Sequence, residues 1–200
     1  MNSKSHDQIQ KLALTALFAA LCYVIFTFLQ IKIPMPGGDA TSLHLGNAFC
    51  VLAALLLGGG YGGLAGAVGM TIADLMDPVY ITGAPKTFVL KFCIGLITGL
   101  LAHKIAHISE STDKKYIFKW SLISSMAGLG FNVIFDPLVG YFYKQYILGQ
   151  PQEMASVLAK WSTATTFVNA VASTILVVIL YNALLPALKK SGLKISSPAW

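Results

Sequence analysis

Long apolar stretches, separated by short polar segments, dominate this chain. A helix needs about 20 apolar residues to cross a bilayer, so the pattern predicts six membrane-spanning helices. Their expected ranges are 12–31, 45–57, 61–76, 87–106, 120–148 and 163–185. The second and third ranges are short, which suggests that these helices tilt or that their polar ends line a cavity.

The segments between these helices predict a tight turn and an orientation. Glycine occupies five of the six positions from 58 to 63, and because glycine adopts positive φ at little cost, a sharp turn is expected there. Lysine is more frequent on the cytoplasmic side of a membrane. Placing both termini inside puts nine lysines inside against four outside. The outer loops would then be 32–44, 78–86 and 149–162.

The composition excludes an ordinary soluble domain. Charged residues make up 11% of the chain and hydrophobic residues 56%, whereas about 25% of a soluble domain is charged. We therefore expect one all-α integral membrane domain over residues 1–200, in contact with the lipid bilayer. The net charge of +6 comes without a basic stripe interleaved with aromatics, so no nucleic-acid partner is expected.

Neither the cysteines nor the familiar catalytic motifs predict an enzyme. Cys22, Cys50 and Cys93 all fall inside apolar runs, where a thiol behaves as a small hydrophobic group, so no metal site or cofactor is expected. The chain has neither the GxxxxGK[ST] loop that binds ATP phosphates nor the GxSxG turn of serine hydrolases. A role other than catalysis is therefore predicted.

Charged and amide side chains inside the predicted spans are the first candidates for a binding site. Asn132 and Asp136 are four residues apart and so share one face of the fifth helix. A carboxylate inside the membrane costs roughly 2.5–3.5 kcal/mol on insertion scales and needs a partner. Lys91 is the expected partner, because the fourth helix should place it at a similar depth. A purely structural ion pair is the alternative.

Further candidates lie near the outer ends of the predicted helices. Asn169 sits on a polar face of the sixth helix, and His44 and Asn47 open the second. Tyr80 and Trp161 are placed near the outer interface, where aromatics usually anchor a protein to lipid but can also stack on a flat ligand. Asp74 and Asp77, at the end of the third helix, could face the site or cap that helix.

Several segments together carry a family resemblance. Residues 44–75 read HLGNAFCVLAALLLGGGYGGLAGAVGMTIADL, and residues 84–92 read APKTFVLKF. With the first outer loop PMPGGD and the ALFAA of the first helix, they resemble the substrate-binding S component of energy-coupling factor (ECF) vitamin transporters. The resemblance covers essentially the whole chain. It is greatest to the group that includes hydroxymethylpyrimidine, pyridoxine and riboflavin carriers.

The resemblance implies a function, partners and a location. Such S components bind a vitamin on the outer side of the bacterial cytoplasmic membrane. They work with a transmembrane coupling protein (the T component) and two ATP-binding cassette ATPases. The family's docking surface for the coupling protein maps onto Ala16 and Ala20. Its ligand site lies in the outer half of the bundle, where Lys91, Asn132 and Asp136 are expected.

The resemblance also suggests which vitamin binds. The stretch GFNVIFDPLVGYFYKQY, residues 130–146, is similar to the hydroxymethylpyrimidine and pyridoxine carriers. Asp136 could then hold a ring nitrogen, Lys91 a phenolate, and Asn132 or Asn169 a hydroxyl group. Riboflavin remains open as a ligand. So do two other functions, a secondary transporter that uses the aspartates as a proton relay and a structural membrane subunit without a ligand.

Overall fold

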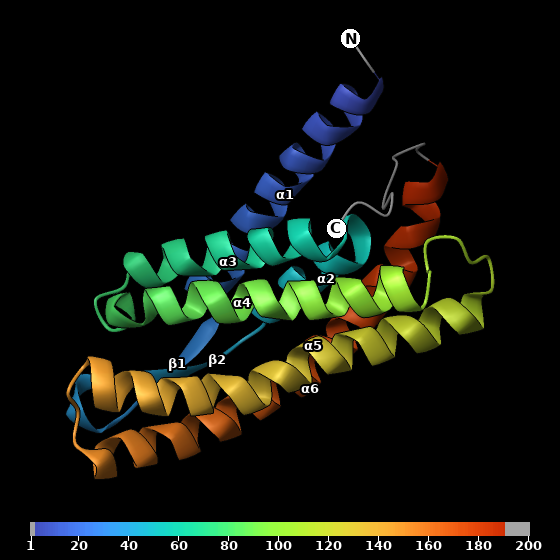
Figure 1. The fold of residues 1–200 in the computed structure, drawn as a ribbon. Coiled ribbons are helices and arrows are strands. Elements are labelled where there is room, and N and C mark those ends of the chain that lie inside the picture. The colour runs from blue at the N-terminus through green and yellow to red at the C-terminus, as the bar shows by residue number, and fades with distance from the viewer. Residues whose placement is uncertain (1–2, 191–200) are drawn as a thin grey trace.

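Six α-helices and a short β-hairpin make up residues 3–190, the part of the chain that the computed structural model describes (Figure 1). Lys194, one of the lysines predicted to lie inside, is outside this described part. The elements are α1 (Ser3–Phe28), β1 (Gln30–Pro34), η1 (Pro36–Gly38), β2 (Ala40–His44), α2 (Gly46–Leu57), α3 (Gly59–Leu75), η2 (Ile81–Gly83), α4 (Ala84–Gly99), η3 (Leu100–Ile105), α5 (Lys114–Phe142), η4 (Tyr143–Ile147) and α6 (Gln152–Lys190). The predicted all-α bundle of six helices is thereby confirmed.

The long helices have the length and composition of membrane spans. Four segments of the described residues can cross a bilayer, namely Asp7–Phe28, Ile81–Ile105, Lys114–Ile147 and Gln152–Lys190. Their outward faces carry exposed apolar side chains such as Phe28, Ile134 and Ile179. Such faces are stable against lipid tails but not against water, so the protein is a multi-pass membrane protein.

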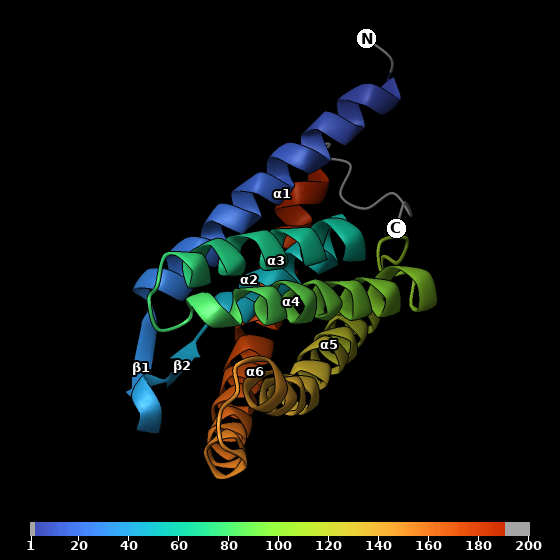
Figure 2. The same cartoon turned by 60° about the vertical axis from the view of Figure 1, so that its left-hand side comes forward.

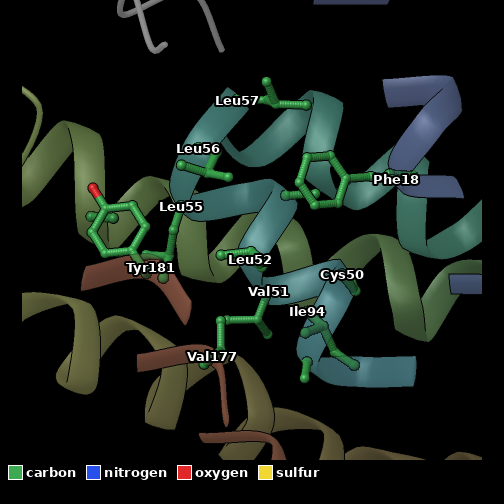
Figure 3. Close-up of a cluster of buried hydrophobic side chains, with 14 of the residues drawn as sticks. Phe18, Cys50, Val51, Leu52, Leu55, Leu56, Leu57, Ile94, Val177 and Tyr181 are labelled. Carbon is green, nitrogen blue, oxygen red and sulfur yellow. The ribbon is translucent and has the colours of Figure 1, made fainter. Parts of the chain in front are cut away.

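The short helix α2 forms the centre of the bundle. Its sequence is apolar on every side, and every residue of α2 except Phe49 is buried. A helix that is hydrophobic all round is stable only when it is surrounded by protein or lipid. Figure 3 shows Val51, Leu52 and Leu55 of this helix in one cluster with Ile94 of α4 and Val177 of α6.

Glycines allow α2, α3 and α4 to pack with their backbones in close contact. A Cβ atom at Gly62 would overlap the backbone of Ala54, and one at Gly95 would overlap the backbone of Gly63. These glycines belong to α3 and α4 and do not form a turn. The predicted glycine turn is confined to Gly58, whose φ of 95° favours glycine.

A β-hairpin covers the end of the bundle where α3 meets α4 (Figure 2). Strands β1 and β2 are antiparallel, with Gln30 opposite His44 and Pro34 opposite Ala40. The sequence analysis placed this segment, 32–44, in an outer loop and did not predict its two strands. The β-branched residues Ile31, Ile33 and Thr41 favour strands, and η1 closes the hairpin with Gly37 at a φ of 80°.

Several predicted helix ends were also wrong. The sixth helix starts at Gln152 and not at 163, because residues 152–162 are good helix formers whose Ala155 and Leu158 are buried. The predicted outer loop 149–162 is therefore mostly helix. Pro186 lies inside α6, which continues to Lys190, and α5 already begins at Lys114, where the side chain of Asp113 caps it.

Candidate functional site

A cavity lies beneath the β-hairpin, at the end of the bundle where α3 meets α4 and where η4 follows α5. Figures 1 and 2 both show that α1 starts, and α6 ends, toward the opposite end of the bundle. Polar side chains from the hairpin and from α2 to α6 line the cavity: Asp39, Thr41, Ser42, His44, Asn47, Asp74, Tyr80, Lys86, Lys91, Asp136, Lys144, Ser162, Thr165 and Asn169.

One wall of the cavity is the contact between α4 and α5. Lys86 forms an ion pair of 2.9 Å with Asp136, whose other carboxylate oxygen accepts a hydrogen bond of 2.7 Å from Ser162. Lys91 donates to the side-chain oxygen of Asn132 at 3.4 Å. The predicted pairing of Lys91 with Asp136 is therefore wrong. The observed partner, Lys86, lies somewhat more than one helical turn earlier in α4.

The hairpin is fixed to α6 by side chains of α6. The amide of Asn169 accepts a hydrogen bond of 3.0 Å from the backbone N–H of His44 and donates one of 2.9 Å to the carbonyl of Ser42. The hydroxyl groups of Thr41 and Thr165 are 2.6 Å apart. Asn169 therefore lies at the cavity, as predicted, but both ends of its amide are engaged by strand β2.

Ion pairs hold the hairpin over the cavity at two points. Asp39, which follows η1, pairs with Lys144 of η4. Lys32 of β1 pairs with Asp77 at the end of α3. Asp77 is not part of the cavity wall, whereas Asp74, one turn earlier, is buried and lines it. This answers the question that the sequence left open about these aspartates.

His44 is a neutral hydrogen-bond acceptor at the base of the hairpin. Burial, together with the nearby positive charge of Lys91, lowers the pKa of His44 to about 3. Its Nδ1 accepts the backbone N–H of Gly46 at 3.2 Å, which a protonated ring could not do. The edge of its ring faces Phe26, with ring centroids 4.6 Å apart.

Lys91 and Asp74 are the charged cavity residues that remain without an ion partner. Both side chains are buried, with 7% and 4% of their surface exposed. Among the described residues, neither has an oppositely charged group within 4.0 Å. Burying an unpaired charge is costly, so a ligand that neutralised either group would remove that cost.

Most of the predicted site residues come together here. The cavity is lined by Lys91, Asp136, Asn169, His44, Asn47 and Tyr80. Asn132 is buried behind Lys91, whereas Trp161 is 48% exposed and does not line the cavity. Sequence reasoning did not select Lys86, Lys144 or Asp39. Lys86 and Asp39 were placed in outer loops and Lys144 near the outer end of the fifth span, although the close spacing of Lys86 and Lys91 on one helix was a usable signal.

A second, shallow groove lies on the outside of the bundle between α1 and α3. It is lined by Ala16, Ala19, Ala20, Tyr23, Val68, Gly69 and Ile72. Ala16 and Ala20, the predicted docking residues, are both exposed. Small side chains of this kind let another helix approach closely within a membrane.

Comparison with known families decides the identity of this bundle. The family model described as the S component of the ECF-type riboflavin transporter matches residues 6–185. The chain belongs to this family of ECF S components. The resemblance predicted from the sequence is thereby confirmed, and the chain is a substrate-binding subunit of a vitamin transporter rather than an enzyme.

A solved structure supports the fold of this S component. That structure is ThiT from Listeria monocytogenes. This chain is similar to it with a TM-score of 0.63, over 92% of this chain and 97% of the ThiT chain. The sequence identity is 16%, so the similarity concerns the fold alone. A comparison with curated proteins found no match.

Proposed function

We propose that this S component captures pyridoxine, or the related hydroxymethylpyrimidine, from outside a bacterial cytoplasmic membrane. A coupling protein and two ATP-binding cassette ATPases would supply the energy for release inside. Family membership supports the role, and the buried polar cavity under the hairpin supports a small polar ligand. The cavity lies at the end of the bundle that the lysine distribution assigns to the outside.

The charges of Lys91 and Asp74 are the observation that favours pyridoxine. Its pyridine nitrogen can be protonated while its phenol is ionised, so the ligand carries a positive and a negative group on one small ring. The phenolate would neutralise Lys91 and the ring N–H would neutralise Asp74, neither of which has an ion partner. Hydroxymethylpyrimidine can offer N–H groups to Asp74 but has no acidic oxygen for Lys91.

The other cavity residues would position this ligand. Asn132 would hold the ammonium group of Lys91 in place. Asp136 would act mainly by fixing Lys86 and Ser162 on the cavity wall, because its carboxylate is already engaged by both. Asn169 would hold the hairpin over the ligand through its hydrogen bond with His44. The remaining polar groups of the hairpin would complete the closed site.

Riboflavin is the second candidate, because the matching family model is described by that vitamin. Its tricyclic ring system needs a broad apolar slot. The cavity does contain large apolar residues, Phe26, Met35, Val79, Leu148 and Leu158, but it also holds the buried charged groups of Lys91 and Asp74, which a neutral tricyclic ring would leave unpaired. We therefore rank riboflavin below pyridoxine.

An uptake assay tests the proposed role against a proton-coupled transporter. The chain would be reconstituted in vesicles with and without the coupling protein and the ATPases. ATP-dependent accumulation of pyridoxine that needs those partners would support the proposal. Accumulation by the chain alone, driven by a proton gradient, would contradict it.

A further inference from the structure

The N-terminus of α2 opens into the same cavity as Lys91. Asn47 is the second residue of α2 and lines the cavity, as does Lys91 of α4. The thiol of Cys50, one turn into α2, contacts the backbone carbonyl of Lys91 at 3.5 Å. The second turn of α2 is therefore adjacent to the turn of α4 that carries Lys91, and the first turn of α2 lines the same cavity.

The N-terminus of α2 keeps one backbone N–H group without an acceptor among the described residues. Leu45 occupies the N-cap position and cannot accept a hydrogen bond through its side chain. The N–H groups of Gly46 and Ala48 find acceptors in His44 and Leu45. The backbone N–H group of Asn47 has no hydrogen-bond acceptor among the described residues.

Asn47 also carries an unsatisfied side-chain oxygen. The residue is 1% exposed, and its carboxamide oxygen is buried without a hydrogen-bond partner among the described residues. Burying such a group without a partner is costly. A ligand that donates a hydroxyl or N–H hydrogen to this oxygen would remove that cost.

The arrangement brings like charges together. A helix N-terminus carries the equivalent of roughly half a positive charge, and here it lines the same cavity as Lys91, whose ammonium group has no ion pair among the described residues. Two positive groups that line one buried cavity repel each other, and an anion bound between them would remove that repulsion. Asp136 and Asp39 are each paired with another lysine, Lys86 or Lys144, and Asp74, on the same cavity, forms no ion pair with Lys91 within 4.0 Å.

We propose that the N-terminal turn of α2 and Lys91 form an oxyanion subsite, in which Asn47 accepts a hydrogen bond from a neighbouring donor group of the ligand. The ligand class is a small molecule with an ionised oxygen next to a hydroxyl or N–H group. This inference rests on the proposed function for its physiological ligand, but the subsite itself can be tested with a simple anion.

The first arm of the test uses formate as the probe. The melting temperature of the purified chain in detergent is measured while formate replaces the bulkier gluconate at constant ionic strength. Formate should raise the melting temperature of the wild type by several degrees and should not affect Lys91→Gln. Lys119→Gln is the matched control, because Lys119 is exposed near the start of α5, far from the cavity, and it should respond as the wild type does.

A second variant guards against misfolding of Lys91→Gln. In Asn47→Asp a carboxylate is placed in the first turn of α2, where it suits the helix dipole and Lys91. This variant should melt higher than the wild type without any anion and should lose its response to formate. A response to formate that persists in Asn47→Asp, or that is equal in the wild type and Lys91→Gln, would overturn the subsite.

The second arm compares pyridoxine with 3-deoxypyridoxine, which lacks the phenolic oxygen. The wild type should bind pyridoxine at least tenfold more tightly, and Lys91→Gln should bind both equally. Equal binding by the wild type, without a formate response, would overturn the subsite and leave the proposed function standing. A Lys91-dependent formate response without pyridoxine binding would support the subsite and contradict pyridoxine as the ligand. If the wild type showed neither a formate response nor pyridoxine binding, both the subsite and pyridoxine as the ligand would be contradicted.

Discussion

Lys86 of α4 and Asp136 of α5 are joined by an ion pair of 2.9 Å at the wall of the cavity. Ser162 of α6 donates to the same carboxylate at 2.7 Å, so one side chain ties together three helices. Both charged side chains are mostly buried, with 17% and 15% of their surface exposed. A pair in this position is sensitive to the loss of either charge.

We predict that Asp136→Asn weakens vitamin binding by roughly 10- to 100-fold, because the loss of a charge-assisted contact leaves Lys86 unpaired at the site. Calorimetric titration of the purified variant would measure this. Asp113→Asn is the control, since Asp113 caps the other end of α5 and asparagine caps equally well. Unchanged affinity in Asp136→Asn would contradict a role for this carboxylate in the site.

Asp74 is predicted to contact the ligand directly. In Asp74→Asn the negative charge proposed to meet the ring nitrogen is lost, so pyridoxine should bind at least tenfold more weakly. Asp77→Asn provides a close comparison, because Asp77 lies one turn away, pairs with Lys32 and does not line the cavity. Similar affinities for the two variants would contradict the assignment of Asp74.

The close packing of α3 and α4 depends on glycine. Gly95→Ala would press a methyl group into the backbone of Gly63, and we expect a loss of about 1–3 kcal/mol in stability. Gly130→Ala has open space around the new methyl group, and the gain in helix propensity should stabilise the protein by about 0.5–1 kcal/mol. Thermal unfolding in detergent would compare them. Shifts of the same sign would contradict this packing argument.

His44 should make the protein less stable in acid. Its pKa is about 3 in the folded chain, against about 6.5 when exposed. The unfolded chain therefore binds the proton first, and stability that is complete above about pH 6.5 falls as the pH is lowered toward 3. At pH 5 the loss should be about 2 kcal/mol.

Melting temperatures at pH 7.5 and pH 5 would measure this effect. The difference should shrink in His44→Gln, which cannot be protonated. It should persist in His107→Asn, because the His107 side chain is 58% exposed and asparagine tolerates its positive φ of 47°. A difference that is unchanged in His44→Gln would show that another group causes it.

The groove around Ala16 is predicted to receive the coupling protein. Ala16→Trp should block co-purification of the transporter complex while vitamin binding by the isolated chain stays normal, because a large side chain would fill the groove. Ile175→Trp on the exposed face of α6 is the control and should leave the complex intact. Normal assembly of the Ala16 variant would contradict this docking surface.

The sequence predicted the order of the helices because apolar length is a strong signal in a membrane protein. It also placed Asn132 and Asp136 on one face of α5, and both side chains contact lysines of α4. Helical periodicity defines a face, but it does not fix how far one helix is shifted along another. For this reason Asp136 was matched with Lys91 when its partner is Lys86.

The hairpin and the start of α6 could not be predicted in the same way. Short strands in a connecting segment carry little periodic signal. Asn169 illustrates the consequence, since its partners are backbone groups of Ser42 and His44, more than 120 positions away along the chain. The site depends on such long-range contacts, which neither composition nor local pattern reveals.

Binding by the isolated chain is the most direct test of the central claim that this S component captures a small vitamin by itself. The purified protein in detergent would be titrated with pyridoxine, hydroxymethylpyrimidine, riboflavin, thiamine, biotin, folate and pantothenate. We predict submicromolar binding of pyridoxine and weaker binding of hydroxymethylpyrimidine. Tight binding of riboflavin alone would contradict the choice of ligand, and no binding of any of these vitamins would contradict the capture role.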